Sequence, residues 1–595
     1  PIAQGLKMAN RELTVIAWLW ARTVKSPNPA FSHVHVPLAS TFVLSTKDGN
    51  EAYVEPVVAG DTYQLVVKMG KPSTSAQEGT KAAGRGANFI CLLSKAPISG
   101  EYIKAQGMSN QLGQRLLAIV ADSHLGRIYL SPTAVHESVA AKVKAPWRSQ
   151  LEFARNSRHL TPWTYGLNTF GALFTERQLM ALSTYVELIQ EARAACHAAA
   201  LSRGFRDDKL KLEQGGNGAL AYAEAVSVYL ALALSRLADI GNALCRWEVT
   251  KTQVRNLFNR QAISMMWDFA ENNMFSNAAG DYAVSLDNML KALAGLPAVG
   301  RACVLNEDAR TQSTSRDKIV STDPPYYDNV PYADLADFFY VWLRRSLRDV
   351  FSDLYAAVAV PKAEELVADA FRQGGKRSAE SFFLQGMTQA IEKLASQTHP
   401  AFPVTIYYAF KQAEKDGNTA TAGAGWQTFL DAVLKAGFSI SGTWPMRTEL
   451  SNRMRGAESN ALASSIVLVC RRRSRDARTV SRREFIRELD ALLPESLLDM
   501  TRGGVNSPVA PVDLSQAIIG PGMAIFSQYA AVLEADGNPM PVRSALQLIN
   551  RFLAEDDFDH DTQFCLHWFE SHGWSIGKFG EADVLARAKG TSVEG

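Results

Sequence analysis

A short β-branched strand that runs through a rigid four-residue turn into an amphipathic helix constrains this chain most. The strand is expected over 318–322, and Asp-Pro-Pro-Tyr follows it at 323–326. The apolar residues of the helix recur at helical spacing: Leu335, Phe338, Phe339 and Trp342. The polar residues expected mostly off this face are Asp334, Asp337 and Arg345. A strand, a rigid turn and a helix in this order are typical of an open α/β sheet, whose ligands lie at the carboxyl ends of strands.

Further strands continue this pattern as far as residue 475. Strands are expected at 404–410, 438–444 and 464–470, and a helix at 426–435 should stop at Gly437. This order predicts the second half of a doubly wound, Rossmann-like sheet that ends in a β-hairpin. The predicted fold class is therefore α/β.

Four segments are expected along the chain. They are a β-rich module over 1–150, a helical region over 151–300, the α/β segment over 301–475 and a helical region over 476–595. Helices of the second segment are expected at 176–200, 219–245 and 254–271. A Gly-rich tract at 215–218 has no strand before it and no Lys-Ser/Thr after it, so it is expected to be an ordinary loop.

Composition is that of an ordinary globular protein. Of 595 residues, 47% are hydrophobic and 21% charged, and a net charge of +2 does not by itself indicate a nucleic-acid binder. The six cysteines form no Cys-x-x-Cys pair, which favours a reducing compartment. The most apolar helical stretch, 225–234, is too short to span a bilayer, and no signal peptide is evident. A soluble, cytoplasmic protein without a membrane partner is expected. Both ends of the chain are abrupt, which predicts a piece of a longer reading frame.

The Asp-Pro-Pro-Tyr segment suits chemistry on an exocyclic amino group, whose nitrogen lone pair is delocalised into a ring. Two acceptors aimed at the amino hydrogens localise that lone pair and stabilise the charge that develops during transfer. The carboxylate of Asp323 and the backbone carbonyl of Pro324 would be these acceptors, and Pro325 stiffens the loop. Tyr326 offers a flat face to a base that has been extruded from a duplex. The alternative is a proline-stiffened turn with a surface aspartate.

Two acidic residues lie upstream of the strand. In doubly wound methyltransferases, an acidic residue at this relative place accepts a hydrogen bond from the adenine amino group of S-adenosylmethionine. Asp308 is the candidate cofactor-binding residue and Glu307 the reserve, with a solvated turn carboxylate as the alternative.

Several long stretches resemble one family of prokaryotic proteins. They are the residues at 322–332, 337–345, 443–449, 459–470 and 14–24, and together they extend the likeness over nearly the whole chain. This pattern resembles the large adenine-specific DNA methylases that carry a zinc-ribbon insert and an N-terminal domain of unknown function, often encoded near defence genes. The resemblance implies N6-adenine methylation of double-stranded DNA with S-adenosylmethionine as the methyl donor. A restriction-modification or defence setting, with further defence proteins as partners, is implied as well.

The chain departs from the family's pattern in its cofactor loop. The family's glycine-rich loop, of Phe-x-Gly-x-Gly type, normally lies before the point where this chain begins, and no such loop is found here. We therefore expect this piece alone to be inactive. Target recognition would be housed before residue 300, in the insert position.

The zinc ribbon is also incomplete. Where the resemblance leads one to expect thiolates, the chain has Ser26, Phe31 and Ser94, and only Cys91 remains. One thiolate cannot hold a structural zinc ion, which takes about four ligands. No metal is expected, and Phe31 is expected to fill the vacated centre beside Cys91.

Nucleic-acid contacts are expected on two stretches. Beside the tetrad, the expected contacts are Tyr327, Asp328, Asn329 and Tyr332. Between residues 447 and 483 there are ten arginines against three acids, a density that suits phosphate contacts. Arg453 and Arg455 are the better candidates, because they lie on the long loop between the last two strands. The arginine run after Cys470 is equally well explained as a solvated linker.

Other functions share parts of this pattern. An N4-cytosine or RNA amino-methyltransferase would use the same acceptor geometry, although a serine in place of Asp323 would have favoured cytosine. A non-catalytic, DNA-binding scaffold subunit of a defence complex is the alternative from another class. The recognition sequence and the oligomeric state do not follow from these residues.

Overall fold

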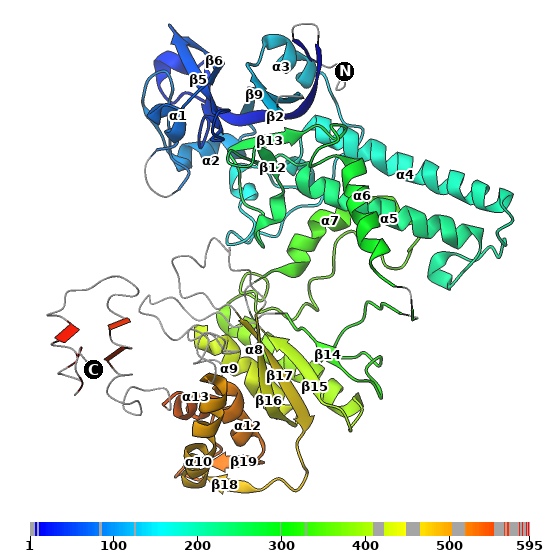
Figure 1. Ribbon diagram of the computed structural model, residues 1–595, viewed down its shortest axis with the longest axis vertical. Coiled ribbons are helices and arrows are strands. Elements are labelled where there is room, and N and C mark those ends of the chain that lie inside the picture. The colour runs from blue at the N-terminus through cyan, green and yellow to red at the C-terminus, as the bar shows by residue number, and fades with distance from the viewer. Residues whose placement is uncertain are drawn as a thin grey trace. The chain divides into compact units, whose positions relative to one another are not determined.

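The chain divides into two compact units in the computed structural model (Figure 1). Unit 1 comprises residues 1–306 and 330–365, and unit 2 comprises 307–329 and 366–595. The structure describes residues 6–8, 11–82, 86–123, 126–297, 299–300, 302–325, 327, 330–408, 422–447, 464–501, 518–551 and isolated positions beyond 563. The α/β segment expected over 301–475 thus contributes residues to both units.

Unit 1 contains a sheet built around one long strand, β2 (Arg11–Lys25). Its antiparallel partners are β1 (Leu6–Met8), β3 (His35–Leu38), β9 (Gly113–Ser123) and β13 (Asp268–Asn272), and β10 (Gly126–Leu130) extends the sheet from β9. Val15, Ile16 and Trp20 are all buried although they alternate in direction along β2. Both faces of β2 are therefore covered, which explains its nearly continuous apolar sequence.

Shorter strands and turns surround this sheet. The strands are β4 (Val43–Ser45), β5 (Ala52–Ala59), β6 (Thr62–Met69), β7 (Phe89–Ile90), β8 (Pro97–Ile98), β11 (Arg246–Glu248) and β12 (Gln253–Arg255). The short helices are α1 (Thr74–Glu78), α2 (Gly100–Met108) and α3 (Ala134–Ala141), with 3-10 turns η1 (Pro29–Phe31), η2 (Pro162–Tyr165), η3 (Phe170–Leu173), η4 (Leu212–Gln214) and η5 (Leu257–Asn259). The first 150 residues are rich in strands, as predicted.

The helix expected at 254–271 was a wrong prediction. This stretch holds β12, the turn η5 and the start of β13 instead. Phe269 pairs with Trp20 and Glu271 with Trp18 of β2, so these residues form a strand of the sheet. Tertiary pairing across some 250 residues overrides the local helical spacing.

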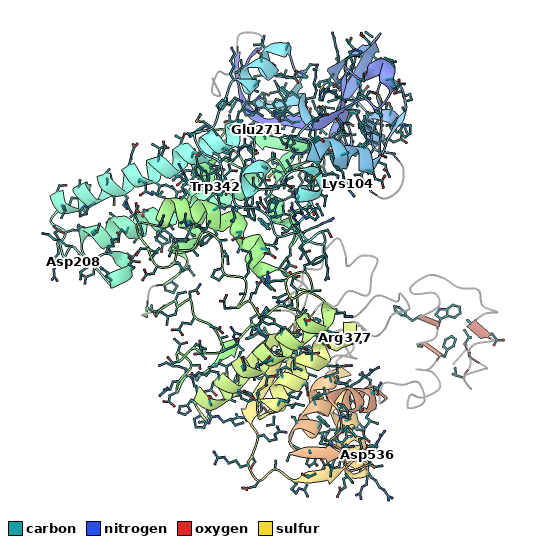
Figure 2. The ribbon with its side chains drawn as sticks, turned by 180° about the vertical axis from the view of Figure 1, so that it is seen from behind. Lys104, Asp208, Glu271, Trp342, Arg377 and Asp536 are labelled. Carbon is teal, nitrogen blue, oxygen red and sulfur yellow. The ribbon has the colours of Figure 1, made fainter. Side chains whose placement is uncertain are left out.

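The helical part of unit 1 is formed by α4 (Glu176–Ser202), α5 (Ala219–Ile240), α6 (Tyr282–Ala294) and α7 (Tyr332–Leu347). The helices α4 and α5 lie side by side as a long pair (Figure 1). Trp342 of α7, labelled in Figure 2, is buried in the same cluster as Leu182 of α4 and Leu234 of α5. Among the described helices, α5 is long and apolar enough to cross a bilayer. The length of α5 corrects the expectation that its apolar stretch is too short to span a bilayer. Leu234 is buried in the cluster shared with α4 and α7, whereas Tyr229 and Leu232 are exposed.

Two acidic residues of α7 are buried, contrary to expectation. Asp334 is 1% exposed and Asp337 is 2% exposed. The Asp337 carboxylate accepts hydrogen bonds from the Val360 backbone N–H (2.8 Å) and pairs with Lys362 Nζ (2.6 Å). The segment that follows α7 folds back over these residues, and helical spacing alone does not reveal that cover.

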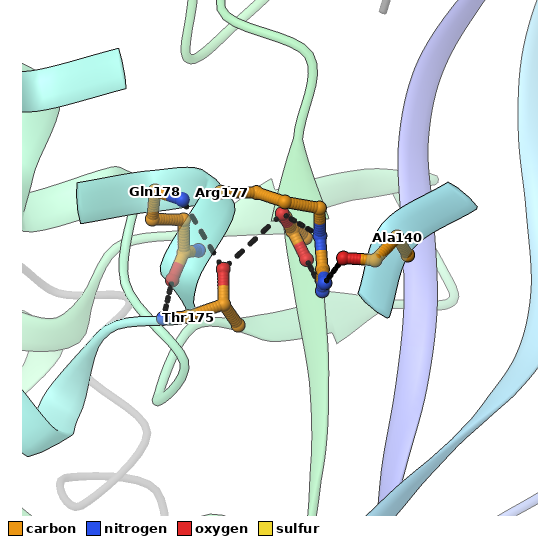
Figure 3. A network of polar contacts seen from close by, with 5 residues as sticks. Ala140, Thr175, Arg177 and Gln178 are labelled. Carbon is orange, nitrogen blue, oxygen red and sulfur yellow. Dashed lines mark hydrogen bonds and ion pairs between the residues drawn. The ribbon is translucent and has the colours of Figure 1, made fainter. Parts of the chain in front are cut away.

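A second buried ion pair joins α4 to the sheet (Figure 3). Arg177 donates to both carboxylate oxygens of Glu271 on β13 (2.9 and 2.7 Å) and to the Ala140 carbonyl (3.1 Å). Thr175 also donates to Glu271, and it forms a capping box with Gln178 at the start of α4. The N-terminus of α4 is thereby fixed to β13.

Unit 2 contains a four-stranded sheet in the order β14-β15-β17-β16. Its strands are β14 (Ser321–Thr322), β15 (Val404–Tyr408), β16 (Phe438–Arg447) and β17 (Ser464–Arg472). β14 and β15 are parallel, whereas β17 is antiparallel to both β15 and β16. β14, β15 and β16 therefore run in one direction, and their carboxyl ends meet at one edge of the sheet.

Helices cover one face of this sheet. Phe383 of α8 (Lys376–Gln397) and Phe429 of α9 (Ala422–Lys435) share a core with Ile406 and Leu468. The remaining elements of unit 2 are α10 (Arg482–Thr501), α12 (Ile519–Ser527), α13 (Val542–Arg551) and the parallel pair β18 (Thr479–Ser481) and β19 (Ala531–Leu533). The strands and the helix predicted between 404 and 472 are confirmed.

Candidate active site at the carboxyl end of β14

The Asp-Pro-Pro segment leaves the sheet at the carboxyl end of β14. Asp323 is exposed, and Pro324 and Pro325 are half-buried. Within the described part of the chain, neither the Asp323 carboxylate nor the Pro324 carbonyl takes part in a hydrogen bond. Partial burial raises the pKa of Asp323 above its ordinary value. Both predicted acceptors thus have no hydrogen-bond partner among the described residues.

Aromatic contacts fix the position of the loop that follows Asp-Pro-Pro. The Tyr327 ring packs edge-to-face on Phe383 of α8, with the ring centroids 5.1 Å apart. The Tyr327 carbonyl accepts a hydrogen bond from the Ala368 N–H (2.7 Å).

 The interplanar angle between these two rings is 79°. The Tyr327 N–H donates to the hydroxyl oxygen of Tyr408 at the end of β15 (3.4 Å), and the Tyr408 ring stacks on Phe429 of α9 (4.2 Å). The position of the loop is therefore set by α8, β15 and α9.

The register of the sheet brings two further aromatic residues to the level of Asp323. Thr322 is paired with Ile406, so Asp323 follows at the level of Tyr407, which is itself in register with Val467 and, across it, Trp444 of β16. Three strand spacings of about 4.8 Å separate β14 from β16, or about 14 Å in all. Tyr407 is half-exposed and Trp444 is 57% exposed.

These aromatic residues lie on the sheet face opposite the helices. Ile406 precedes Tyr407 on β15, and Leu468 pairs with Thr443, which precedes Trp444 on β16. Ile406 and Leu468 belong to the core under α8 and α9, and successive side chains of a strand alternate between faces. Tyr407 and Trp444 were not among the residues predicted for the site. The alternation of buried and half-exposed residues along 404–408 carries the signal for Tyr407, but the pairing that aligns Trp444 with it is long-range.

Asp308 lies beside a different part of α8 from the Asp-Pro-Pro loop. Its carboxylate accepts hydrogen bonds from Arg310, both from Nη2 (2.6 Å) and from Nε (3.0 and 3.1 Å). These bonds hold the pKa of Asp308 below its ordinary value. An open hollow next to it is lined by Gln389, Lys393 and other residues of α8, whereas Tyr327 contacts this helix near its start, at Phe383.

The remaining predicted contacts are distributed as follows. Tyr332 is exposed at the start of α7 in unit 1, whereas Tyr327 packs within unit 2. The predicted residues that lie outside the described part of the chain are Tyr326, Asp328, Asn329, Arg453 and Arg455.

The arginine run after Cys470 has structural partners. Arg471 donates to the Ala401 carbonyl (3.4 Å) and Arg472 to the Thr398 carbonyl just after α8 (2.7 Å). Arg473 donates to the Leu434 carbonyl at the end of α9 (2.7 Å) and to the Tyr529 carbonyl (2.9 Å). Two of these arginines thus satisfy carbonyl groups at helix C-termini, where cations are favourable.

The ribbon-like module brings together two of the positions singled out in the sequence. Ser26 Oγ lies 3.3 Å from Cys91 Sγ. Burial alone would raise the pKa of the Cys91 thiol, but hydrogen bonds with Ser26 and Ser94 hold it below its ordinary value. Among the described residues, no group of three or more His, Cys, Asp or Glu side chains is placed to hold a metal ion.

The expected position of Phe31 was wrong. The buried cluster around Cys91 contains Phe89, Ile98 and Ile103, with Leu93 packed against it, but Phe31 is not part of it. Phe31 ends the turn η1 and is half-buried. Phe89 of β7, Ile98 of β8 and Ile103 of α2 fill this centre instead.

Comparison with known proteins leaves the family of the chain open. The model of a domain of unknown function (DUF8807) matches residues 559–595. No curated protein and no solved structure matches the chain. The matched residues are the last part of the sequence and include neither β14 nor its loop, and the match assigns no activity to them.

Proposed function

We propose that this chain carries the base-accepting half of an S-adenosylmethionine-dependent DNA amino-methyltransferase, specific for the N6 position of adenine. One observation carries the proposal. Asp323 presents an exposed carboxylate at the carboxyl end of a parallel strand, and the Pro324 carbonyl beside it has no partner among the described residues. This is the place where open α/β sheets bind their ligands.

The chemistry follows from the two acceptors. The Asp323 carboxylate and the Pro324 carbonyl would each accept one hydrogen of the exocyclic amino group, so that the nitrogen lone pair points at the incoming methyl group. Their charge matters most as the nitrogen becomes cationic, which makes the interaction stronger in the transition state than in the ground state. S-adenosylmethionine would supply the methyl group when bound.

The aromatic residues beside the site support a nucleobase as the substrate. Tyr407 and Trp444 lie on the sheet face opposite α8 and α9, at the level of Asp323 along the strands. Aromatic rings stack on a base whatever its sequence context, at about 1–3 kcal/mol per base. Base extrusion would expose the amino group to Asp323, because a base inside a duplex cannot be reached.

The residue predicted to bind the methyl donor does not fit that role. Asp308 was the candidate for the adenine amino group of the cofactor, but its carboxylate is occupied by Arg310. It also lies beside a different part of α8 from the loop that carries Asp323. We therefore assign no residue of this chain to the donor, and the proposal is restricted to the base-accepting side.

Methylation in cells tests the proposal. Because no residue of this chain is assigned to the methyl donor, the test uses host cells that express the complete gene. The gene unchanged, with Asp323→Ala and with Asp476→Ala would be compared by long-read detection of N6-methyladenine. Asp476 is the matched control, because it is exposed in the same unit and its side chain makes no polar contact with described residues. Loss of one preorganised acceptor costs about 3–4 kcal/mol, so Asp323→Ala should lower the methylation rate by about 100- to 1,000-fold.

The outcomes separate this function from its alternatives. Adenine methylation that depends on Asp323 and not on Asp476 supports the proposal. N4-methylcytosine or methylated RNA would replace it with another amino-methyltransferase. DNA that carries no added methyl group, together with tight DNA binding by both the unmodified protein and Asp323→Ala, would indicate a scaffold subunit.

A further inference from the structure

Unit 1 contains a hollow of about 790 Å³ at one end of the α4–α5 pair. Its charged and titratable lining residues are Arg193, His197, Lys211, Glu224, Arg348 and Asp349. All belong to unit 1 and come from α4, the turn η4, the start of α5 and the segment after α7. Figure 2 labels Asp208 in the connection between the two helices, close in sequence to Lys211.

Several contacts hold the walls of this hollow in place. Lys211 Nζ donates to the Asp349 carbonyl (3.1 Å), and Ser352 donates to the Glu213 carboxylate through its backbone N–H (3.1 Å) and its hydroxyl (3.2 Å). Arg193 and His197 are four residues apart on α4 and therefore lie on the same side of that helix. The cavity is lined by fixed elements rather than by one loop.

The cations of this hollow outnumber its anions. Arg193, Lys211 and Arg348 are permanently charged, against the carboxylates of Glu224 and Asp349. The Glu224 carboxylate accepts a hydrogen bond from the Leu212 N–H (2.6 Å), so one of its oxygens already has a partner within the protein. Asp349 is only a weak counter-ion, because its side chain is 76% exposed and lies 3.7 Å from Arg193.

Two of the lining groups have unused hydrogen-bonding capacity. The Nε2 atom of His197 is buried and has no hydrogen-bond partner in the described structure. The guanidinium group of Arg348 makes no hydrogen bond or ion pair with any described residue. Buried polar atoms are rarely left without a partner, so an unsatisfied nitrogen beside a hollow points to a ligand or water.

We propose that this hollow binds the phosphate group of a small phosphorylated molecule, with Arg348, Arg193 and His197 as its ligands. A guanidinium group offers paired N–H donors that match the oxygens of a phosphate, and an imidazole N–H adds one more donor. The apolar side chains of Ala194 and Leu220 line the rest of the cavity and would contact the non-phosphate part of the ligand. This inference is independent of the proposed methyl transfer.

Calorimetric titration of the whole chain with pyrophosphate tests the site, because this probe carries the phosphate chemistry without a base or sugar. The variant Arg348→Gln removes the cationic, paired donors of the guanidinium group, and His197→Leu removes the ring nitrogen donor. Neither change breaks a side-chain hydrogen bond between described residues. Removal of a charge-assisted hydrogen bond costs about 1.5–3 kcal/mol. We expect the affinity to fall by about 10- to 100-fold in Arg348→Gln, and measurably in His197→Leu.

Arg203→Gln is the matched control, because Arg203 directly follows α4, is exposed and does not line the hollow. Its affinity for pyrophosphate should equal that of the unmodified chain, and circular dichroism should show all three variants folded. ATP that competes with pyrophosphate would identify a nucleotide as the source of the phosphate, whereas inorganic phosphate that competes equally well would identify a free anion. The proposal is overturned if pyrophosphate does not bind, if Arg203→Gln weakens binding as much as Arg348→Gln, or if only duplex DNA binds.

Discussion

At the scale of single residues, the stability of unit 1 should depend strongly on its buried ion pair between Arg177 and Glu271. The side chains of Arg177 and Glu271 are only 13% and 6% exposed, and the guanidinium group also lies over the Trp20 ring (4.7 Å). Either charge would be costly to leave alone in this environment, since solvent cannot replace the lost partner. The contact joins α4 to β13 and thus links the helices of the unit to its sheet.

We predict that Arg177→Leu lowers the free energy of unfolding by about 3–5 kcal/mol, because it leaves Glu271 buried without its counter-ion. Urea denaturation followed by circular dichroism measures this change. Lys68→Ala is the control, since Lys68 and Glu55 form a pair whose side chains are 48% and 47% exposed. That substitution should change stability by at most about 1 kcal/mol. An equal loss in both variants would show that the buried pair contributes no more than a surface pair.

The loss of methyl-transfer activity at low pH should follow the protonation of Asp323. The carboxylate accepts a hydrogen bond from the amino group only when it is deprotonated, so activity is present above its pKa and is lost as the pH falls through it. Because partial burial raises this pKa, the acid limb should lie above the ordinary value of 3.8. A profile of kcat/KM against pH measures this, and in Asp323→Asn the remaining activity should lack the limb. A limb that persists unchanged in Asp323→Asn would have to come from another group.

At the scale of secondary-structure elements, the sequence predicts those whose signals are local. The long helices α4 and α5 and the strands β15, β16 and β17 are expected from spacing and breakers, and the structure has them. β13 was missed because its strand character comes from pairing with β2, far away in the chain. The packing of α7 with α4 and α5 also depends on distant partners, so its sequence did not reveal that Asp334 and Asp337 are buried.

The candidate site shows the same division. The exposure of Asp323 at the end of a strand follows from the order strand, turn, helix. The alignment of Trp444 with it depends on two strand registers, which the residues around either position do not specify. Asp308 and Arg310 are only two residues apart, yet the sequence does not distinguish an Asp308 that pairs with Arg310 from one that is left to bind a ligand.

One contact between elements leaves no room for a side chain. A Cβ atom added at Gly107 of α2 would lie 2.2 Å from the Tyr165 carbonyl oxygen of η2, and one at Gly166 would lie 2.0 Å from the Gly107 carbonyl oxygen. Gly166 also has a φ of +83°, which other residues rarely adopt. Backbone therefore lies against backbone where α2 meets η2.

We predict that Gly107→Ala destabilises unit 1 by about 1–3 kcal/mol, because the two backbones must separate to admit a methyl group. Thermal or urea unfolding measures the change. Gly295→Ala is the control, since its added Cβ would meet no atom closer than 3.5 Å. That change should stay within about 0.5 kcal/mol. Full stability of Gly107→Ala would mean that α2 and η2 can separate without loss.

At the scale of the whole molecule, each unit is formed by two stretches of chain that are not continuous. The sheet of unit 1 includes β13, and Arg22 of β2 donates to the carbonyl groups of Met266 (2.9 Å) and Ala243 (3.0 Å). Arg22 is 9% exposed, so these bonds satisfy a buried cation. Residues 1–150 thus depend on partners that lie beyond residue 240.

We predict that a fragment of residues 1–150 does not fold, because it lacks β13 and leaves the Arg22 guanidinium without its acceptors. A fragment of residues 1–365 contains every segment of unit 1 and should unfold cooperatively in urea. Circular dichroism and urea titration of both fragments make the comparison. A cooperative transition in the 1–150 fragment would show that the β-rich module is an independent domain.

The alternation of the chain between the units has a consequence for synthesis on the ribosome. Unit 1 needs α7 to complete its helical core, but α7 emerges only after β14, which belongs to unit 2. The strand β14 must then wait for β15, some 80 residues later, before it can pair. The apolar residues of α4 and α5 that pack against α7 therefore stay uncovered until residue 347 has left the exit tunnel. The nascent chain passes through a long interval in which holdase chaperones would have a hydrophobic surface to bind.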